Sequence, residues 1–302
     1  MTIKETFGDR LFNFTNVVLL SLVLLLVAYP LYFIIIASFS NPDLVNTGKV
    51  LFLPRDISWE GYKMVYHFGD LWLGYRNTIF YAIFGTLINL AVTLPAAYSL
   101  SRKDFRWKSF FVAFFMVPMF FGGGLIPTYL LMTRTLGLND TVWAILIPGA
   151  TGMMQMVIAR TFFQSTVPDE LRESAEIDGA SNFRVFFTIV LPLSTAIIAV
   201  QGLQAAVGHW NAYFNAFLYL SDLGARRLQP LSIVLRRILV IAQASAVADE
   251  FMQDQTSYVE RLRRVEQIKY AMIIVSVIPI LVAYPFIQRY FVKGVMIGAI
   301  KG

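Results

Sequence analysis

Acidic and small side chains gather in one short segment of the sequence, residues 164–186. Small residues let another backbone approach closely, and carboxylates at the edge of a contact can pair with cations on a partner. This combination suits docking against another protein, although an ordinary surface helix has the same composition. The candidate docking residues are Glu173, Ser174, Ala175, Asp178, Gly179 and Ala180.

Helix-boundary signals divide this segment into two helices joined at a glycine. Thr166 and Asp169 have the spacing of a capping box, and Pro168 suits a first turn, where its missing N–H costs nothing. Gly179 can adopt the left-handed conformation that ends a helix. Ser181 can then cap a second helix. We therefore predict a short helical hairpin.

The chain lacks the residue sets that catalysis requires. It has no cysteine and only two histidines, His67 and His209. It contains neither the Gly-x-x-x-x-Gly-Lys-Ser/Thr loop that binds nucleotide phosphates nor the His-Glu-x-x-His sequence that binds zinc. The net charge of +6 is not gathered into the basic patch that nucleic-acid binding needs. We expect no enzyme activity, no cofactor or metal bound by this chain, and no nucleic-acid partner.

The sequence around these residues is apolar enough to need a bilayer as its solvent. Of its 302 residues, 57% are hydrophobic and 15% are charged, whereas soluble domains carry about 25% charged residues. About 20 apolar residues cross a bilayer core as a helix. Stretches that meet or approach this length are residues 14–39, 77–100, 109–132, 142–163, 186–210 and 271–291. We predict an all-α integral membrane protein with six spans in a single domain, residues 1–302.

Basic residues in short loops predict which side of the membrane is cytoplasmic. Residues 102–108 hold four Lys and Arg side chains between the second and third spans, so this loop, both termini and the hairpin are expected inside. Residues 211–270 also carry many Arg residues but would lie outside, because long loops translocate largely regardless of charge. Within that loop, apolar residues at helical spacing predict a short helix over 231–239, and residues 249–266 form a polar insertion.

The hairpin sequence resembles the EAA loop of ATP-binding-cassette (ABC) importer permeases. Residues 288–302 resemble the tail of the maltose-type, MalG-like members, and together with six spans the resemblance covers essentially the whole chain. Ser174 stands where alanine is usual, and the polar insertion is longer than in the maltose-type members, as in a subgroup of polysaccharide or lipoprotein-type (LplC-like) permeases. The motif residues are Glu173-Ser174-Ala175, Gly179, Ile189 and Leu191-Pro192.

The resemblance implies a type I ABC importer permease in a bacterial cell membrane that takes up oligosaccharides delivered by a solute-binding protein. It implies two further partners, a second permease subunit and an ATPase dimer that binds ATP and Mg²⁺. In the family, the hairpin inserts into a cleft of the ATPase, and its glutamate and glycine carry the coupling. The corresponding residues are Glu173 and Gly179. The identity and length of the sugar stay open.

Aromatic and amide residues near the end of the fifth span are candidates for contact with a transported sugar. Sugars present apolar faces that stack on aromatic rings, and hydroxyl groups that bond to amides. The candidates are Gln204, Trp210, Asn211, Tyr213 and Phe214. Aromatic residues at a span end are also common interfacial anchors. His209 is a further candidate contact, but we favour a histidine packed between helices at this position.

Two other classes of membrane protein fit the sequence less well. An ion-coupled carrier needs ionisable residues within its spans, and the predicted spans hold almost none. Arg160 and Arg289 lie near span ends, where long side chains reach the interface. A membrane-embedded enzyme needs a convergent set of acid, base or nucleophile, and no predicted span carries one.

Overall fold

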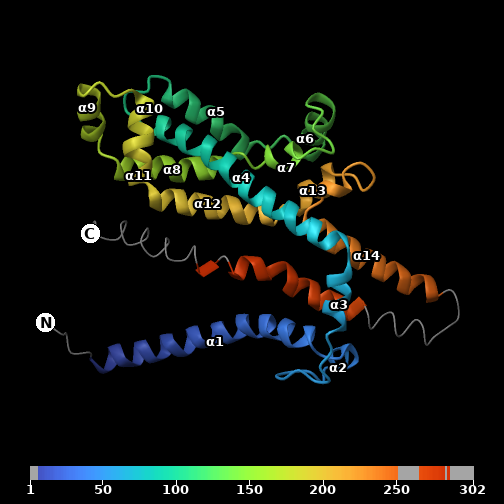
Figure 1. Ribbon diagram of the computed structural model, residues 1–302. Coiled ribbons are helices and arrows are strands. Elements are labelled where there is room, and N and C mark those ends of the chain that lie inside the picture. Colours follow the sequence, from blue (N-terminus) through green and yellow to red (C-terminus); the bar gives the residue numbers. More distant parts are fainter. Residues whose placement is uncertain (1–5, 251–264, 283, 286–302) are drawn as a thin grey trace. The chain divides into compact units, whose positions relative to one another are not determined.

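The computed structural model describes residues 6–250, 265–282 and 284–285, and the regular elements in these ranges are all helices (Figure 1). The predicted all-α class is therefore confirmed for this part of the chain. Two compact units are present: Met1–Gly69 with Leu235–Pro279, and Asp70–Val234 with Ile280–Gly302. Both candidate sites lie in the second unit.

The first unit is dominated by α1 (Phe7–Ser38), which begins at a capping box formed by Thr6 and Asp9. Only 6% of the most apolar part of α1 is buried, as expected for a helix surrounded by lipid or by another subunit. A small apolar core packs around Ile36, Ala37, Val45 and Val50. The other helices of this unit are α2 (Pro42–Asn46), α3 (Glu60–His67), the larger part of α14 (Leu231–Glu250) and most of the helix Val265–Val282.

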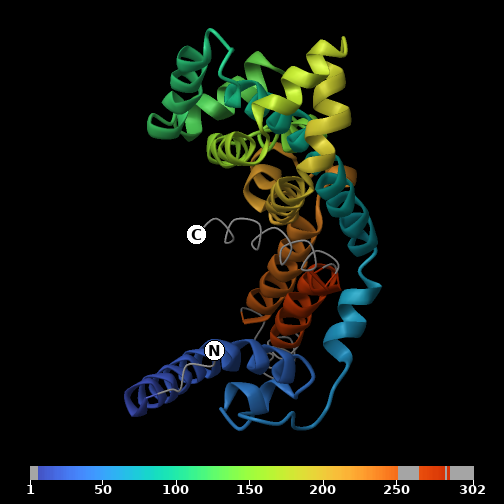
Figure 2. The same ribbon diagram turned by 90° about the vertical axis from the view of Figure 1, so that its left-hand side faces the viewer.

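Three helices form the centre of the second unit: α4 (Asp70–Ser101), α8 (Met153–Thr166) and α12 (Thr195–Trp210). They lie side by side, with α4 packed against both of the others (Figures 1 and 2). Tyr98 on α4 and Phe163 on α8 meet edge to face inside a buried apolar cluster, with ring centroids 5.7 Å apart. In lipid, close packing rather than the hydrophobic effect holds such helices together.

Two helical stretches of this unit bend sharply. After α5 (Lys108–Phe120), the chain turns by 113° into α6 (Leu125–Leu130) and η1 (Leu131–Thr135). Gly124, at φ +82°, supplies the left-handed conformation that this break needs. The second bend is 84°, between α12 and the helical stretch that precedes it, which consists of α10 (Asn182–Val185), η2 (Phe186–Val190) and α11 (Leu191–Leu193).

The predicted spans are only partly reproduced as helices. Within the described ranges, three helices are long and apolar enough to cross a membrane, or five if each bent pair forms one span. The predicted span over 142–163 is not one continuous helix: α7 (Trp143–Leu146) ends early and α8 begins at Met153. Pro148, Gly149 and Gly152 lie between them and break the helix. The sixth predicted span is described only to residue 285, and the tail 288–302 lies outside the described residues.

The predicted loop over residues 211–270 is largely helical where it is described. It contains α13 (Tyr213–Tyr219), η3 (Arg226–Leu228) and α14 (Leu231–Glu250), so the short helix predicted over 231–239 is the first half of α14. Side chains of α4 hold the start of this helix: Thr78 Oγ1 accepts from the Leu231 N–H at 2.8 Å, and Tyr81 donates to the Leu228 carbonyl at 2.8 Å. Most of the polar insertion, 251–264, lies outside the described residues.

Candidate functional site

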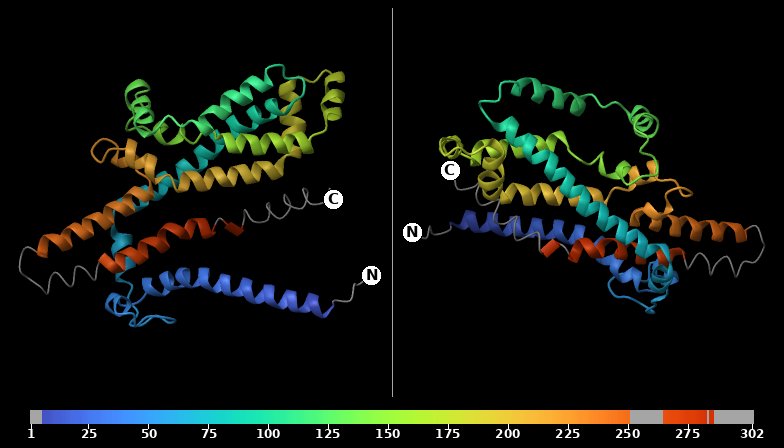
Figure 3. Two further views of the ribbon diagram at one scale, coloured as in Figure 1. Left: turned by 180° about the vertical axis from the view of Figure 1, so that it is seen from behind. Right: turned by 45° about the horizontal axis from the view of Figure 1, so that its top comes forward.

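The candidate docking segment forms two helices, α9 (Asp169–Ile177) and α10, joined at Gly179 (Figure 3). The Gly179 N–H donates to the Glu176 carbonyl at 3.0 Å, and the Ala180 N–H donates to the Ala175 carbonyl at 2.9 Å. This is the hydrogen-bond pattern of a Schellman helix end. Gly179 has φ +77°, and a Cβ at this position would meet nothing within 4 Å. Backbone conformation, rather than lack of space, therefore selects glycine here.

The start of α9 differs from the prediction. Thr166 is the last residue of α8, and Pro168 stands at the N-cap of α9 without a side-chain hydrogen bond. Asp169 instead pairs with Lys103 at 2.8 Å. The predicted capping box is therefore wrong, because α8 continues farther than expected and the carboxylate is used in an ion pair. The predicted cap at Ser181 is confirmed, since its Oγ accepts from the backbone of Arg184.

One small residue anchors α9 to the rest of the unit. Ala175 is 8% exposed and belongs to the apolar cluster around Tyr98 and Phe163. The side chain of Glu173 is 63% exposed. Two large apolar residues are also exposed, Ile177 at 87% and Phe183 at 79%. The hairpin thus presents acidic and apolar side chains together on an open surface.

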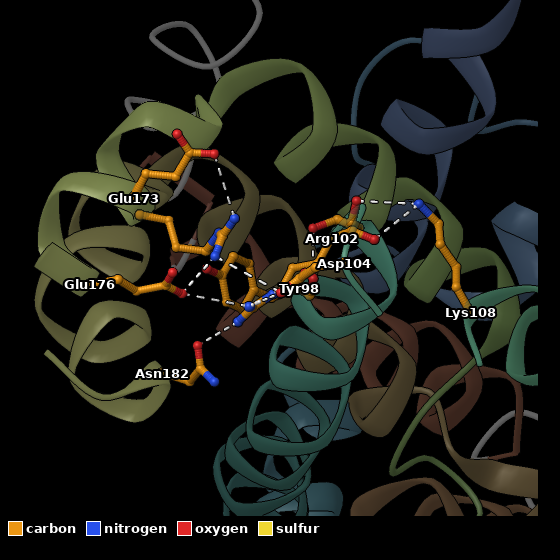
Figure 4. A network of polar contacts seen from close by, with 9 residues as sticks. Tyr98, Arg102, Asp104, Lys108, Glu173, Glu176 and Asn182 are labelled. Carbon is orange, nitrogen blue, oxygen red and sulfur yellow. Dashed lines mark hydrogen bonds and ion pairs between the residues drawn. The ribbon is translucent and has the colours of Figure 1, made fainter. Parts of the chain in front are cut away.

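A network of polar contacts connects α9 and α10 with the loop between α4 and α5 (Figure 4). Arg172 binds Glu176 at 2.6 Å within α9. Arg102 pairs with Asp104 in the loop and donates to Asn182 Oδ1 at 2.6 Å. The two arginine side chains are only 16% and 17% exposed, whereas Asp104 and Glu176 are roughly half exposed. The guanidinium groups therefore form the centre of the network and the carboxylates its rim.

The charges of this network are fixed at neutral pH. The hydrogen bond from the Arg102 guanidinium holds the pKa of Asp104 below its ordinary value, and Lys103 does the same for the pKa of Asp169. A carboxylate with a lowered folded-state pKa stabilises the fold above its unfolded pKa of about 4. That contribution is lost only as the pH falls through the folded-state value. The link between hairpin and loop is therefore insensitive to physiological pH changes.

The residues predicted to line a sugar path do not converge on one site. Gln204 lines a cavity of about 250 Å³, and the other four candidates do not. Trp210 is the last residue of α12 and Asn211 follows as its C-cap. Tyr213 and Phe214 lie on α13, where the ring of Tyr213 stacks on Phe217 at 5.8 Å.

Sequence reasoning missed two amides that line the same cavity, Asn89 on α4 and Gln155 on α8. The Asn89 amide donates to Gln155 Oε1 at 2.9 Å and to the Gly149 carbonyl at 3.0 Å. Gln201 on α12 donates to the Gln155 carbonyl at 2.8 Å. These hydrogen bonds connect the three central helices. A polar residue within an apolar span is usually functional, and this pattern could have identified both amides from the sequence.

His209 is packed between helices and also borders this cavity. It is 6% exposed, and its ring lies so close to Gly85 on α4 and to Gly149 that a Cβ on either glycine would overlap it. The packed-residue interpretation of His209 is therefore supported. Among the described residues, no group of three or more His, Cys, Asp or Glu side chains could hold a metal ion.

We expect Gly85→Ala to destabilise the second unit, because its new methyl group must displace a buried ring. Overpacking of this kind costs about 1–3 kcal/mol, which should lower the apparent melting temperature of the purified protein. Gly202→Ala on α12 is the matched control, since its Cβ would lie 3.7 Å from Leu90, an ordinary contact. The double variant Gly85→Ala/His209→Ala should recover part of the loss. Equal stability of both glycine variants would contradict this packing.

Comparisons with known proteins cover nearly the whole chain. Residues 68–297 match the family model described as binding-protein-dependent transport system inner membrane component. The chain is 34% identical over 301 residues to protein LplC of Bacillus subtilis (strain 168), covering 100% of this chain and 98% of that relative. It is 33% identical over 294 residues to the polygalacturonan/rhamnogalacturonan transport system permease protein YtcP of the same strain, covering 97% and 99%.

The fold is also similar to a solved structure. A chain in the crystal structure of a bacterial ABC transporter involved in the import of the acidic polysaccharide alginate superposes with a TM-score of 0.81 at 31% sequence identity. The match covers 96% of this chain and 100% of that chain. Sequence and fold therefore agree on the same class of membrane protein.

Proposed function

The chain belongs to the family of binding-protein-dependent transport system inner membrane components, and on this premise we propose that the hairpin of α9 and α10 is the surface through which an ATPase drives it. The chain is the permease subunit of an ABC importer and is not an enzyme. ATP and Mg²⁺ would bind to the partner ATPase. A second permease subunit and a solute-binding protein would complete the importer.

The cargo that we propose is an oligosaccharide. YtcP is named for the transport of polygalacturonan and rhamnogalacturonan, and the solved importer for the import of alginate. Both match nearly the full length of this chain, and both names refer to polymers of sugars. We propose six spans within one permease domain, residues 1–302: the three long helices, the two bent helix pairs each counting as one span, and the stretch 142–163 with α7 and α8 as the sixth. Both termini, the hairpin and the loop 102–108 would lie in the cytoplasm, and residues 211–270 outside.

The surface chemistry of the hairpin carries the coupling proposal. Glu173, Ile177 and Phe183 are exposed on the hairpin, whose buried residues Ala175 and Val185 belong to the core cluster around Tyr98. Exposed large apolar residues beside a charge are typical of a protein interface. The polar network would then transmit movement of the hairpin to the cytoplasmic end of α4, so that the spans rock between inward-open and outward-open states. Ser174, Asp178 and Ala180 would lie within the same interface.

Uptake by the reconstituted importer tests this function. The chain, its partner permease and the ATPase subunits would be placed in proteoliposomes with the loaded binding protein and labelled oligosaccharides. We expect uptake that requires both ATP and the binding protein. Uptake driven by an ion gradient without ATP would contradict the proposal and favour an ion-coupled carrier.

Asp104→Asn should weaken the transmission of movement without abolishing ATPase binding. The substitution removes the charge that pairs with Arg102 from the loop, while the exposed surface of the hairpin is unchanged. We expect uptake to fall several-fold and ATP consumed per sugar to rise, with ATPase still co-purifying. Lys103→Gln is the control, because Lys103 is 87% exposed and its pair with Asp169 is open to solvent. Equal effects of the two variants would contradict this assignment.

A further inference from the structure

The cavity beside α12 is lined by apolar and small residues together with uncharged hydrogen-bonding side chains. Its volume of about 250 Å³ is bounded by α4, α7, α8, α12, α13 and the segment between α7 and α8. Among the described residues that line it, none is Lys, Arg, Asp or Glu. The polar lining residues are Asn89, Thr151, Gln155, Gln204, His209 and Asn215.

One acceptor in this wall is left unused by the protein. Asn89 is 2% exposed, and its amide nitrogen is bonded to Gln155 and to the backbone of Gly149. Its Oδ1 is buried and has no hydrogen-bond partner among the described residues. Leaving such an atom unpaired costs free energy, and a small rotation of the amide toward the cavity would let a ligand supply the missing donor.

The cavity is open to the outside of the unit. Its exposed lining residues are Gln204 and Gly208, one turn apart on α12, and Pro148 and Thr151 between α7 and α8. A Cβ at Gly208 would meet nothing within 4 Å, so a larger side chain there has room to narrow the entrance on the α12 side. The volume exceeds that of several waters, each about 30 Å³, yet lies below the roughly 300–1,000 Å³ of pockets for drug-sized ligands. It is suited to a single sugar unit rather than to a whole oligosaccharide.

We infer that this cavity binds the hydroxyl groups of one sugar unit as an oligosaccharide passes through the permease. Amide groups both donate and accept hydrogen bonds, which matches hydroxyl groups. A carboxylate would find no Lys or Arg among the described lining residues. The inference rests on the proposed importer function and adds the residues of this chain that contact the cargo.

Closing the entrance with Gly208→Leu tests the inference. The new side chain projects into open space, and leucine favours a helix more than glycine does, so α12 should be retained. Proteoliposomes holding the whole importer would be supplied with labelled raffinose, arabinotriose or trigalacturonate on a saturating amount of binding protein. We expect uptake of the transported sugar to fall at least about tenfold, the effect of a ~1.4 kcal/mol penalty. ATPase stimulation by the loaded binding protein should be retained.

Gln204→Leu keeps the test decisive if Gly208→Leu fails to assemble. It alters an exposed side chain at the same entrance, and we expect roughly a fivefold loss of uptake, the effect of about one hydrogen bond. Gly202→Ala, on α12 but outside the cavity lining, should transport like the wild type. Wild-type uptake by both entrance variants would overturn the inference and leave the importer function standing. If the wild-type importer carried none of these sugars, the proposed function would fail and the inference with it.

Discussion

Glu173→Lys should abolish sugar uptake while leaving the permease folded. The side chain is 63% exposed and lies 3.9 Å from the guanidinium of Arg172, a long ion pair, so reversal of its charge disturbs little within the chain. At an interface with the ATPase, by contrast, a wrong charge costs several kcal/mol. At about 1.4 kcal/mol per tenfold change, uptake and ATPase association should each fall at least about 100-fold. Uptake assays and co-purification with the ATPase measure the two effects.

Glu60→Lys is the matched control for this charge reversal. Glu60 is also exposed, but it lies in the first turn of α3 in the other unit. It should leave ATPase association unchanged, and both variants should elute from size-exclusion chromatography like the wild type. Retention of ATPase and full uptake by Glu173→Lys would contradict the coupling role of Glu173.

Gly179→Val should uncouple sugar uptake from the ATPase. The cause would be strain in the backbone at residue 179 rather than the loss of a side-chain contact. At φ +77° a β-branched residue is strained, and such strain costs about 1–3 kcal/mol. The Schellman hydrogen bonds at the end of α9 should break, and the exposed acidic residues of α9 would then move relative to α10. We expect uptake to fall roughly tenfold or more, with weaker ATPase association in co-purification.

Gly179→Asn separates conformation from space at the same position. Asparagine tolerates the left-handed region far better than valine does, and a Cβ here meets no atom within 4 Å. The asparagine variant should therefore keep most of its uptake. If both variants were equally impaired, the ATPase would require the absence of a side chain at residue 179, and the conformational explanation would be wrong.

Local signals predicted the hairpin well wherever one residue decides the backbone. Gly179 and Ser181 act as predicted because a left-handed helix end and an N-cap depend on few neighbours. The capping box at Thr166 failed because packing of Phe163 extends α8, and because Lys103, distant in sequence, pairs with Asp169. Such long-range contacts leave no local pattern.

Hydropathy located the apolar segments, and their breaks follow from proline and glycine rather than from hydropathy. The stretch 142–163 is apolar enough to resemble a span, yet its proline and glycines separate α7 from α8. The cavity was missed for a related reason. Asn89 and Gln155 are 66 residues apart in sequence and meet only after α4 and α8 pack together. The aromatic residues near 210–214 were predicted to contact sugar because of their residue type, which does not reveal their position in the fold.

Labelling of a single cysteine at Ile177 tests the central claim most directly. The chain has no cysteine of its own, and Ile177 is 87% exposed on α9. Ile177→Cys should react with a membrane-impermeant maleimide only from the cytoplasmic side, and bound ATPase should protect it. Leu223→Cys, at a fully exposed position in the predicted outer loop, should react only from outside whether or not ATPase is present. Reaction of Ile177→Cys from outside, or equal reaction with and without ATPase, would contradict the account.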